Sequence, residues 1–357
     1  METMLINGIG GPTPRSIARV LRTKFPEIRI VGIDANPKAV GFFMPGLVDE
    51  YYVSPKASSK DEYWNFIHDI IMEEKINYAI VQPEKEVIAW GEYYNDNKEY
   101  PCPTFLPGKD LALNLMDKAL MAEALAGTEF IPTTVKVSQN NPKYEEVERE
   151  IGFPCWIRAT QGSGGLGSLK LQDVNSYKSW LFINSDIHEF TISEFLTGRH
   201  LANQMLYFNG KLIKAASLEC AEYVMASIAP SKVTGNTAFG RFLNDDKLTD
   251  FCDTCIQYVC AKLGVKAHGV LSFDLKEDSN GNYKVTEVNI RHMAYTGIMS
   301  SVGFDLVADT VNLLRTGDIN VEEKSPYYHF DKPYIFLRDV DLEPIILESE
   351  EIFSKRN

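Results

Sequence analysis

The sequence predicts an α/β fold in which a parallel α/β domain precedes an α+β lid and a second α+β domain. Short apolar segments alternate with amphipathic helical patterns over the first third of the chain, an order typical of a parallel sheet covered on both faces. Short strands with sharp turns follow, which is the pattern of an α+β unit. The length of 357 residues suits two or three domains.

The first unit is expected to alternate strand and helix. Apolar runs predict strands, and a one-sided apolar periodicity predicts helices. The expected strands are residues 3–7, 28–34 and 78–82, and the expected helices are residues 15–24, 61–74 and 87–94. Ligands of parallel sheets gather at the carboxyl ends of the strands, which are here residues 7–14, 34–36 and 82–86.

The middle of the chain begins with a helical pattern over residues 111–125 and then turns to strands. The dipeptide Asn209-Gly210 is a strong signal for a two-residue hairpin turn. Expected strands are 135–137, 156–159, 168–171, 190–195, 202–207 and 212–218, with helices over 144–150 and 174–182.

The last part is expected to contain a long helix, a hairpin and a further helix. The helix over residues 246–263 ends at Gly264, and a hairpin joins 269–276 to 283–289. A further helix is expected over 304–314. The predicted organisation is a substrate domain (1–110), a helical linker with a lid (111–200), a metal-bearing domain (201–320) and a tail (321–357).

Charge and composition exclude several classes of protein. The net charge of −13 disfavours nucleic acid and anionic membranes as partners, and no apolar run is long enough to span a membrane. The chain begins with a short apolar strand but without the basic region and cleavage site of a signal peptide, so the cytoplasm is the expected location. The six cysteines do not form a disulfide framework in a chain of this length and are expected to be reduced packing thiols.

A glycine-rich loop is the first candidate for chemistry. The segment 153–168 carries Arg158 on a strand and then four glycines within six residues, including Gly164, Gly165 and Gly167. Such a loop can lay its N–H groups on phosphate oxygens. A strand follows it rather than a helix, so it is neither a dinucleotide fingerprint nor a Walker loop. By itself it is equally compatible with a flexible surface hairpin.

Two acids in the expected hairpin are the second candidate. Asp274 and Glu287 are approximate cross-strand partners around the turn at Gly281, and Asn289 shares their face. Two carboxylates and an amide oxygen suit Mg²⁺ bound through nucleotide phosphates. Arg291 falls on the same face and could neutralise a transferring phosphoryl group.

Together these segments resemble the ATP-grasp superfamily, and within it the large subunit of carbamoyl phosphate synthetase and the carboxylate–amine ligases built like it. The shared motifs are Phe-Pro-x-x-Ile-Arg-x-x-x-Gly-Ser-Gly-Gly-x-Gly from 153, Ser-Glu-Phe-Leu-Thr-Gly from 193 and Glu-Val-Asn-Ile-Arg from 287. The resemblance covers about residues 1 to 314. It implies an ATP-grasp fold with a pre-ATP-grasp first domain.

The resemblance also implies roles for individual residues. Lys118 and Arg158 would reach ATP phosphate, and the glycines of the loop would fold over it. Glu194 with the backbone of Phe195 and Leu196 would hold adenine. Asp274, Glu287 and Asn289 would bind Mg²⁺, with Mn²⁺ as an alternative, and Arg291 would hold the γ-phosphate and the acyl phosphate.

Two points depart from the family pattern or stay open. Relatives often carry an acid after the position of Gly198 for the ribose hydroxyls, where this chain has Arg-His-Leu-Ala-Asn, so Asn203 or Gln204 is a candidate substitute. Glu84 and Glu86, at the end of an expected strand, either hold a substrate amino group or cap the next helix.

The function that follows is an ATP-dependent ligase. A carboxylate becomes an acyl phosphate, which an amine or ammonia attacks to give an amide, ADP and phosphate. The alternatives are phosphoryl transfer of the carboxylase or carbamoyl phosphate type and a nucleotide-binding regulator without turnover. A dinucleotide oxidoreductase fits only the first third of the chain. The expected partners are small carboxylates and amines, and by resemblance a second copy of the chain in a homodimer.

Overall fold

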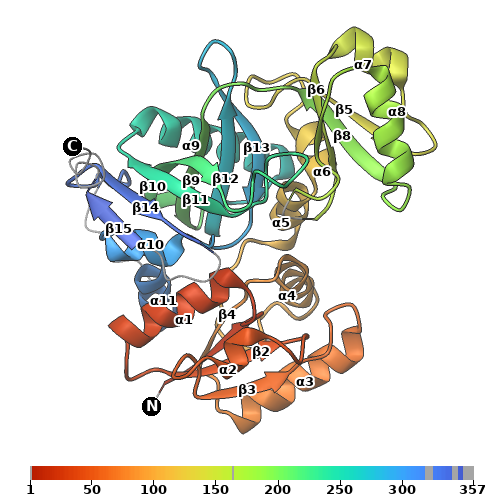
Figure 1. Cartoon of the computed structure of the whole chain (residues 1–357). Helices are drawn as coiled ribbons and strands as arrows, with labels where there is room; N and C mark the ends of the chain where they lie inside the picture. The colour runs from red at the N-terminus through yellow and green to blue at the C-terminus, as the bar shows by residue number, and fades with distance from the viewer. Residues whose placement is uncertain (1, 163–164, 318–324, 340–344, 349–357) are drawn as a thin grey trace.

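The computed structural model describes residues 2–162, 165–317, 325–339 and 345–348. The chain forms three units, each built around its own sheet (Figure 1). The predicted α/β class with a parallel first sheet and later antiparallel sheets is confirmed. None of the helices in the described part of the chain is both long and apolar enough to cross a membrane.

The N-terminal unit is a parallel four-stranded sheet in the order β3-β2-β1-β4. The expected strands and helices are all present, and the sequence analysis missed only α2 and β3. The elements are β1 (Thr3–Asn7), α1 (Pro12–Lys24), β2 (Arg29–Asp34), α2 (Val40–Phe43), β3 (Glu50–Val53), α3 (Lys60–Glu73), β4 (Tyr78–Ile80) and α4 (Glu84–Asn97).

Two short helices replace the single helix expected over 111–125. These are α5 (Lys109–Met116) and α6 (Lys118–Ala124). Asp117 separates them because its backbone is extended and its carboxylate accepts hydrogen bonds from the N–H groups of Ala119 and Leu120, which makes it the N-cap of α6. Lys118 is therefore the first residue of a helix rather than an interior one.

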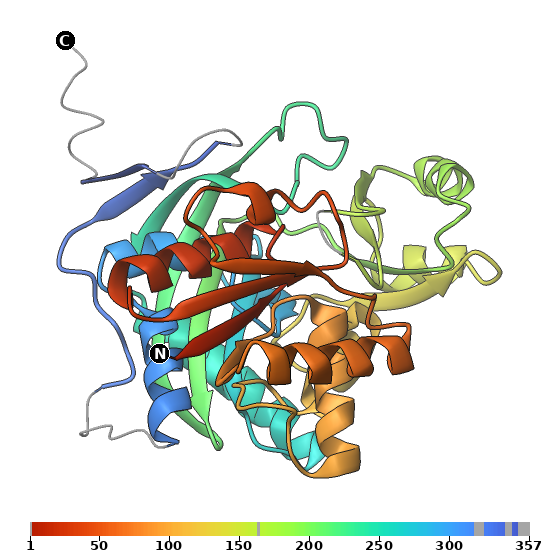
Figure 2. The ribbon, with the colours of Figure 1, turned by 90° about the horizontal axis from the view of Figure 1, so that it is seen from below.

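The lid is a four-stranded antiparallel sheet in the order β5-β8-β6-β7, covered by two helices. It contains a hydrophobic cluster made only of its own residues, and in both Figure 1 and Figure 2 it stands to one side of the other units. Its elements are β5 (Thr134–Ser138), α7 (Tyr144–Glu150), β6 (Cys155–Ala159), β7 (Leu169–Leu171), α8 (Val174–Ile183) and β8 (Glu189–Glu194).

The largest sheet has seven strands in the order β13-β12-β9-β10-β11-β14-β15. The hairpin turn at Asn209-Gly210 is confirmed, since both residues have positive φ and join β9 to β10. The elements are β9 (His200–Phe208), β10 (Lys211–Tyr223), β11 (Thr237–Leu243), α9 (Asp246–Leu263), β12 (Gly269–Glu277), β13 (Tyr283–Asn289), α10 (Thr296–Ser301), α11 (Leu306–Thr316), β14 (Tyr334–Leu337) and β15 (Ile345–Glu348).

The strands β14 and β15 come from the segment expected to be a tail. The strand β14 pairs with β11, so this segment extends the large sheet. The domain boundaries given above remain predictions.

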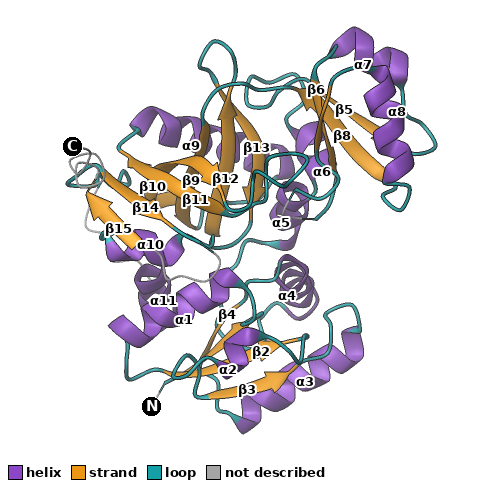
Figure 3. Cartoon of the chain, in the orientation of Figure 1, coloured by secondary structure: helices purple, strands orange, loops and turns teal. Residues whose placement is uncertain are grey.

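The large sheet is covered on both faces (Figure 3). One face packs with α5 and α9 in a cluster that continues into the N-terminal unit, and the other packs with α10 and α11. The N-terminal unit and the large sheet thus share one core, whereas the lid has its own. All six cysteines are buried and unpaired, as predicted.

Candidate nucleotide and metal site

A cavity of about 1070 Å³ lies where the three units meet. Its walls come from the turn after β1, the glycine-rich loop, the end of β8 and the strands β10, β12 and β13. Of the predicted site residues, the ones that line it are Lys118, Arg158, Gly165, Glu194, Phe195, Leu196, Asp274, Glu287, Asn289 and Arg291. The tertiary structure therefore gathers in one place residues that are up to 173 positions apart in the sequence.

The acidic end of the cavity is formed by the hairpin of β12 and β13. Asp274 pairs directly with Glu287 across the two strands, and Ser272 pairs with Asn289, so the predicted register is confirmed. The Asn289 side-chain amide donates a hydrogen bond of 3.1 Å to the Asp274 carboxylate. Burial, and after it the nearby charge of Glu287, raises the pKa of Asp274 to about 7.

This donor set fits a divalent cation. Two carboxylates held side by side repel each other, and the raised pKa of Asp274 reflects that repulsion together with burial. A hard cation bound by oxygen ligands would relieve it. The described residues contain no group of three or more His, Cys, Asp or Glu side chains placed to hold a metal ion, so the third oxygen would come from the Asn289 amide.

Two cations face these acids. The Lys118 side chain is almost fully buried, with its Nζ 3.6 Å from a Glu287 oxygen and donating to the Gly162 carbonyl at 3.1 Å. The buried Nε of Arg158 has no hydrogen-bond partner among the described residues. Burial lowers the pKa of Arg158, while Glu287 and Asp274 act in the opposite direction. A buried donor without an acceptor is available to donate to an anionic ligand.

Not all of the predicted glycines of the glycine-rich loop line the cavity. Gly162 and Gly165 line the cavity, but Gly167 is not among the described lining residues. It lies at the base of the loop with positive φ, where its carbonyl accepts a hydrogen bond from the Trp180 indole. Gly164 lies outside the described residues. Gly165 also has positive φ, and a Cβ there would lie 2.7 Å from the Val233 carbonyl oxygen, so a side chain would clash with the facing loop.

Arg291 lines the cavity, but its guanidinium is paired with the N-terminal unit. Its Nη2 donates to Glu84 at 2.9 Å, and its Nη1 donates to the His292 carbonyl at 3.1 Å. Glu84 belongs to the first turn of α4. The sequence suggested that Glu84 either holds a substrate amino group or caps the helix. Neither role describes its observed contact, which is to an arginine 207 positions away.

Glu86 is not a cavity residue. It is buried, and its carboxylate accepts hydrogen bonds from the Tyr63 hydroxyl at 2.6 Å and from the Asn7 amide at 2.5 Å. Burial raises its pKa, whereas these two hydrogen bonds act to lower it. Glu86 thus ties the end of β1 to α3 and α4 instead of contacting a substrate.

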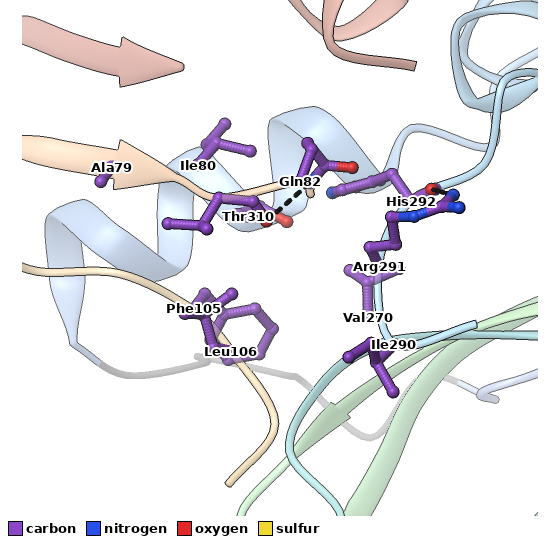
Figure 4. Close-up of a pocket in the computed structure, with 11 residues that line it drawn as sticks. Ala79, Ile80, Gln82, Phe105, Leu106, Val270, Ile290, Arg291, His292 and Thr310 are labelled. Atoms are coloured by element: carbon purple, nitrogen blue, oxygen red, sulfur yellow. Dashed lines mark hydrogen bonds between the residues drawn. The ribbon is translucent and has the colours of Figure 1, made fainter. Parts of the chain in front are cut away.

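A second, very small cavity of about 10 Å³ lies behind Arg291 (Figure 4). The side chains of Gln82, from the end of β4, and His292 point toward one another in it. Burial lowers the pKa of His292 to about 4, so this imidazole is neutral at physiological pH. The small cavity is lined by residues of the N-terminal unit and of the large sheet, so Arg291 lies at the contact between these two units.

The other end of the cavity is formed by the end of β8. Glu194, Phe195 and Leu196 line it, and the Phe195 ring lies 6.2 Å from the ring of Trp156. The suggested ribose substitutes are wrong. Asn203 and Gln204 are fully buried, and their side-chain amides donate to neighbouring elements: Asn203 to Ser217 of β10 and Thr249 of α9, and Gln204 to Thr296 of α10.

Comparison with known proteins agrees with this geometry. Residues 116–318, more than half of the chain, match the family described as carbamoyl-phosphate synthase L chain, ATP binding domain. The chain belongs to this family. The matched segment runs from α5 through the lid to the end of α11, so it contains both the glycine-rich loop and the acidic hairpin. Among curated proteins, none is similar to this sequence.

Solved structures share the fold at low sequence identity. One is the biotin carboxylase domain of Hydrogenobacter thermophilus 2-oxoglutarate carboxylase, which was crystallised with MgADP and bicarbonate. It is 16% identical with a TM-score of 0.68, and the match covers 94% of this chain and 74% of that domain. N5-carboxyaminoimidazole synthetase from Staphylococcus aureus in complex with ADP is 14% identical (TM-score 0.69; 94% and 82% covered). The L-amino acid ligase of Bacillus licheniformis is 11% identical (TM-score 0.67; 94% and 79% covered).

Several cationic residues of the cavity were not predicted from the sequence, and Lys170, Lys276 and Arg338 are three of them. Lys170 on β7 and Lys276 on β12 lie near Phe195. Arg338 follows β14, and its guanidinium donates to the Asn236 amide oxygen at 2.6 Å. No local motif marks them. Lys276 could have been found from its position two residues after Asp274, on the same face of β12, whereas Arg338 lies outside the matched segment.

Proposed function

We propose that the protein is an ATP-dependent ligase that activates a carboxylate as an acyl phosphate and transfers it to an amine or to ammonia. One observation carries the proposal: Asp274, Glu287 and Asn289 share a cavity with Lys118 and Arg158 at the junction of the lid and the large sheet. This is the arrangement of charges that a nucleotide polyphosphate with a divalent cation requires. Membership of an ATP-binding family supports it.

The first step forms the acyl phosphate. An oxygen of the substrate carboxylate attacks the γ-phosphorus of ATP, the bond from that phosphorus to the bridging oxygen breaks, and ADP leaves. Lys118 and Arg158 hold the phosphate oxygens and offset the charge that spreads over them. Asp274, Glu287 and Asn289 would hold Mg²⁺, which supplies further charge neutralisation at the phosphates when bound.

The second step forms the amide. The amine nitrogen attacks the carbonyl carbon of the acyl phosphate, phosphate leaves, and the nitrogen loses a proton to phosphate or water. Arg291 is suited to hold the acyl phosphate. Arg338 is suited to hold the substrate carboxylate, because the only neighbour to which its guanidinium donates among the described residues is the neutral Asn236. Closure of the lid, which has its own core, would exclude water from the intermediate.

The test is acyl phosphate formation from a panel of carboxylates. Purified protein with ATP and Mg²⁺ is assayed for phosphate release, with hydroxylamine as a general amine that converts any acyl phosphate to a hydroxamate. Bicarbonate is included as a separate acceptor to detect the carboxylase or carbamoyl phosphate type of reaction. Glu287→Gln should abolish turnover, and Glu73→Gln, at the exposed end of α3, is the matched control. ATP binding without turnover on any acceptor would instead favour a nucleotide-binding regulator.

We also propose small-molecule carboxylates and amines as the partners, a homodimer as the assembly and the cytoplasm as the location. The biotin carboxylase domain of Hydrogenobacter thermophilus was crystallised as a dimer, which supports testing the assembly by light scattering of the purified protein.

A further inference from the structure

The end of the cavity next to Phe195 carries an unusual pair of lysines. The Nζ of Lys170 lies 4.1 Å from the centre of the Phe195 ring, and the Nζ of Lys276 lies 5.4 Å from the same centre. Both lysines line the cavity and both are partly buried. The two ammonium groups are thus separated by less than roughly 10 Å, a distance over which salt does not fully screen their repulsion.

Neither lysine has a counter-charge among the residues that the structure describes. Within the described ranges, Lys170 and Lys276 form no ion pair and no side-chain hydrogen bond, although other cations of the cavity do. Lys118 pairs with Glu287, and Arg291 pairs with Glu84. The acid next to Lys276 in the chain, Glu277, is occupied by Arg199, which contacts it through Nε at 3.0 Å and through Nη2 at 2.6 Å.

The pair also joins two separately packed parts of the protein. Lys170 belongs to β7 in the lid, and Lys276 belongs to β12 in the large sheet. Because the lid has a hydrophobic core of its own, its approach to the large sheet is what brings the two ammonium groups together. Without an anion between them, this contact opposes closure. With an oxyanion between them, it favours closure.

We propose that Lys170 and Lys276 form a second oxyanion subsite, separate from the triphosphate end at Lys118 and Arg158, that links the lid to the large sheet. The subsite lies beside the hinge proposed to hold the base, where the chain lacks the acid that relatives use for the ribose. Its ligand is a phosphate-class oxyanion, either a phosphate on the ribose of the bound nucleotide or a free inorganic phosphate. This inference rests on the proposed nucleotide site.

The experiment compares nucleotides that differ only by a ribose phosphate. AMP, adenosine 2′,5′-bisphosphate and adenosine 3′,5′-bisphosphate compete with a fluorescent ATP analogue for the protein. In a second arm, protein saturated with ADP and Mg²⁺ is titrated with inorganic phosphate by calorimetry. The variants are Lys170→Met and Lys276→Met. Lys284→Met is the matched control, because Lys284 pairs with Lys276 across the hairpin but donates to the Glu129 carbonyl instead of lining the cavity.

A ribose phosphate as ligand predicts that one bisphosphate binds about tenfold more tightly than AMP, the effect of one well-placed charged contact. A free oxyanion predicts phosphate binding to the ADP complex. In either case both cavity variants should remove the effect, and Lys284→Met should keep it. The inference is overturned if neither arm shows binding, or if binding survives in Lys170→Met and Lys276→Met. Normal ATP turnover in that case would leave the proposed function intact.

Discussion

The raised pKa of Asp274 makes cation binding depend on pH over a range that is easy to measure. With a pKa of about 7, Asp274 is protonated in about nine of ten molecules at pH 6 and in about one of ten at pH 8. A cation needs the ionised carboxylate, so its apparent affinity should rise about tenfold between these two pH values. Binding should release about 0.9 protons per site at pH 6 and about 0.1 at pH 8.

The raised pKa of Asp274 also determines how the stability of the cation-free protein changes with pH. The pKa of Asp274 in the folded protein lies above its ordinary value of 3.8. The folded state therefore binds more protons than the unfolded state over this interval. The contribution of this group to stability is present below the ordinary value and is lost as the pH rises through about 7. Added cation should restore stability above pH 7.

The assay is calorimetric titration with Mn²⁺, in place of Mg²⁺, in buffers of different ionisation enthalpy. Asp274→Asn should remove the dependence on pH. Glu287→Gln should move it to lower pH, because Glu287 is one of the two causes that raise the pKa of Asp274. Proton release that is absent at pH 6, or equal in the wild type and Asp274→Asn, would refute the reasoning.

Three further predictions follow from single contacts. Arg158→Ala should weaken ATP binding about tenfold, because it removes the buried guanidinium that would donate to the phosphates. Equal ATP affinity of the variant and the wild type by calorimetry would show that Arg158 does not bind ATP. Glu84→Gln should lower kcat with little change in the KM for ATP, because Arg291 loses the carboxylate that orients it; a rise in KM alone would argue against this. Glu86→Leu should lower the free energy of unfolding by about 1–3 kcal/mol, because the Tyr63 hydroxyl is left buried without an acceptor, whereas Glu86→Gln, which keeps an acceptor, should cost less in the same denaturant titration.

Local patterns were enough to predict most of the strands, helices and hairpins. The Asn209-Gly210 turn sets its own geometry through two positive φ angles. The turn at Gly281 pairs Leu275 with Val285, and a register shift between Leu275 and Asp274 then brings Asp274 opposite Glu287. The break at Asp117 was missed because an apolar pattern continues across it, although aspartate is a preferred N-cap.

The sequence by itself determined which residues sit at turns and which side chains share a strand face, because these depend on backbone preferences and on the period of two along a strand. It thereby specified the acids of the hairpin and Arg158 of the glycine-rich segment. Only the tertiary structure decided that Glu84 holds Arg291, that Arg338 reaches the cavity and that Lys170 meets Lys276. The Glu84 and Lys170 contacts join different units of the chain, and Arg338 follows a strand, β14, that lies far along the chain from its neighbour β11, so all three depend on packing that no local pattern encodes.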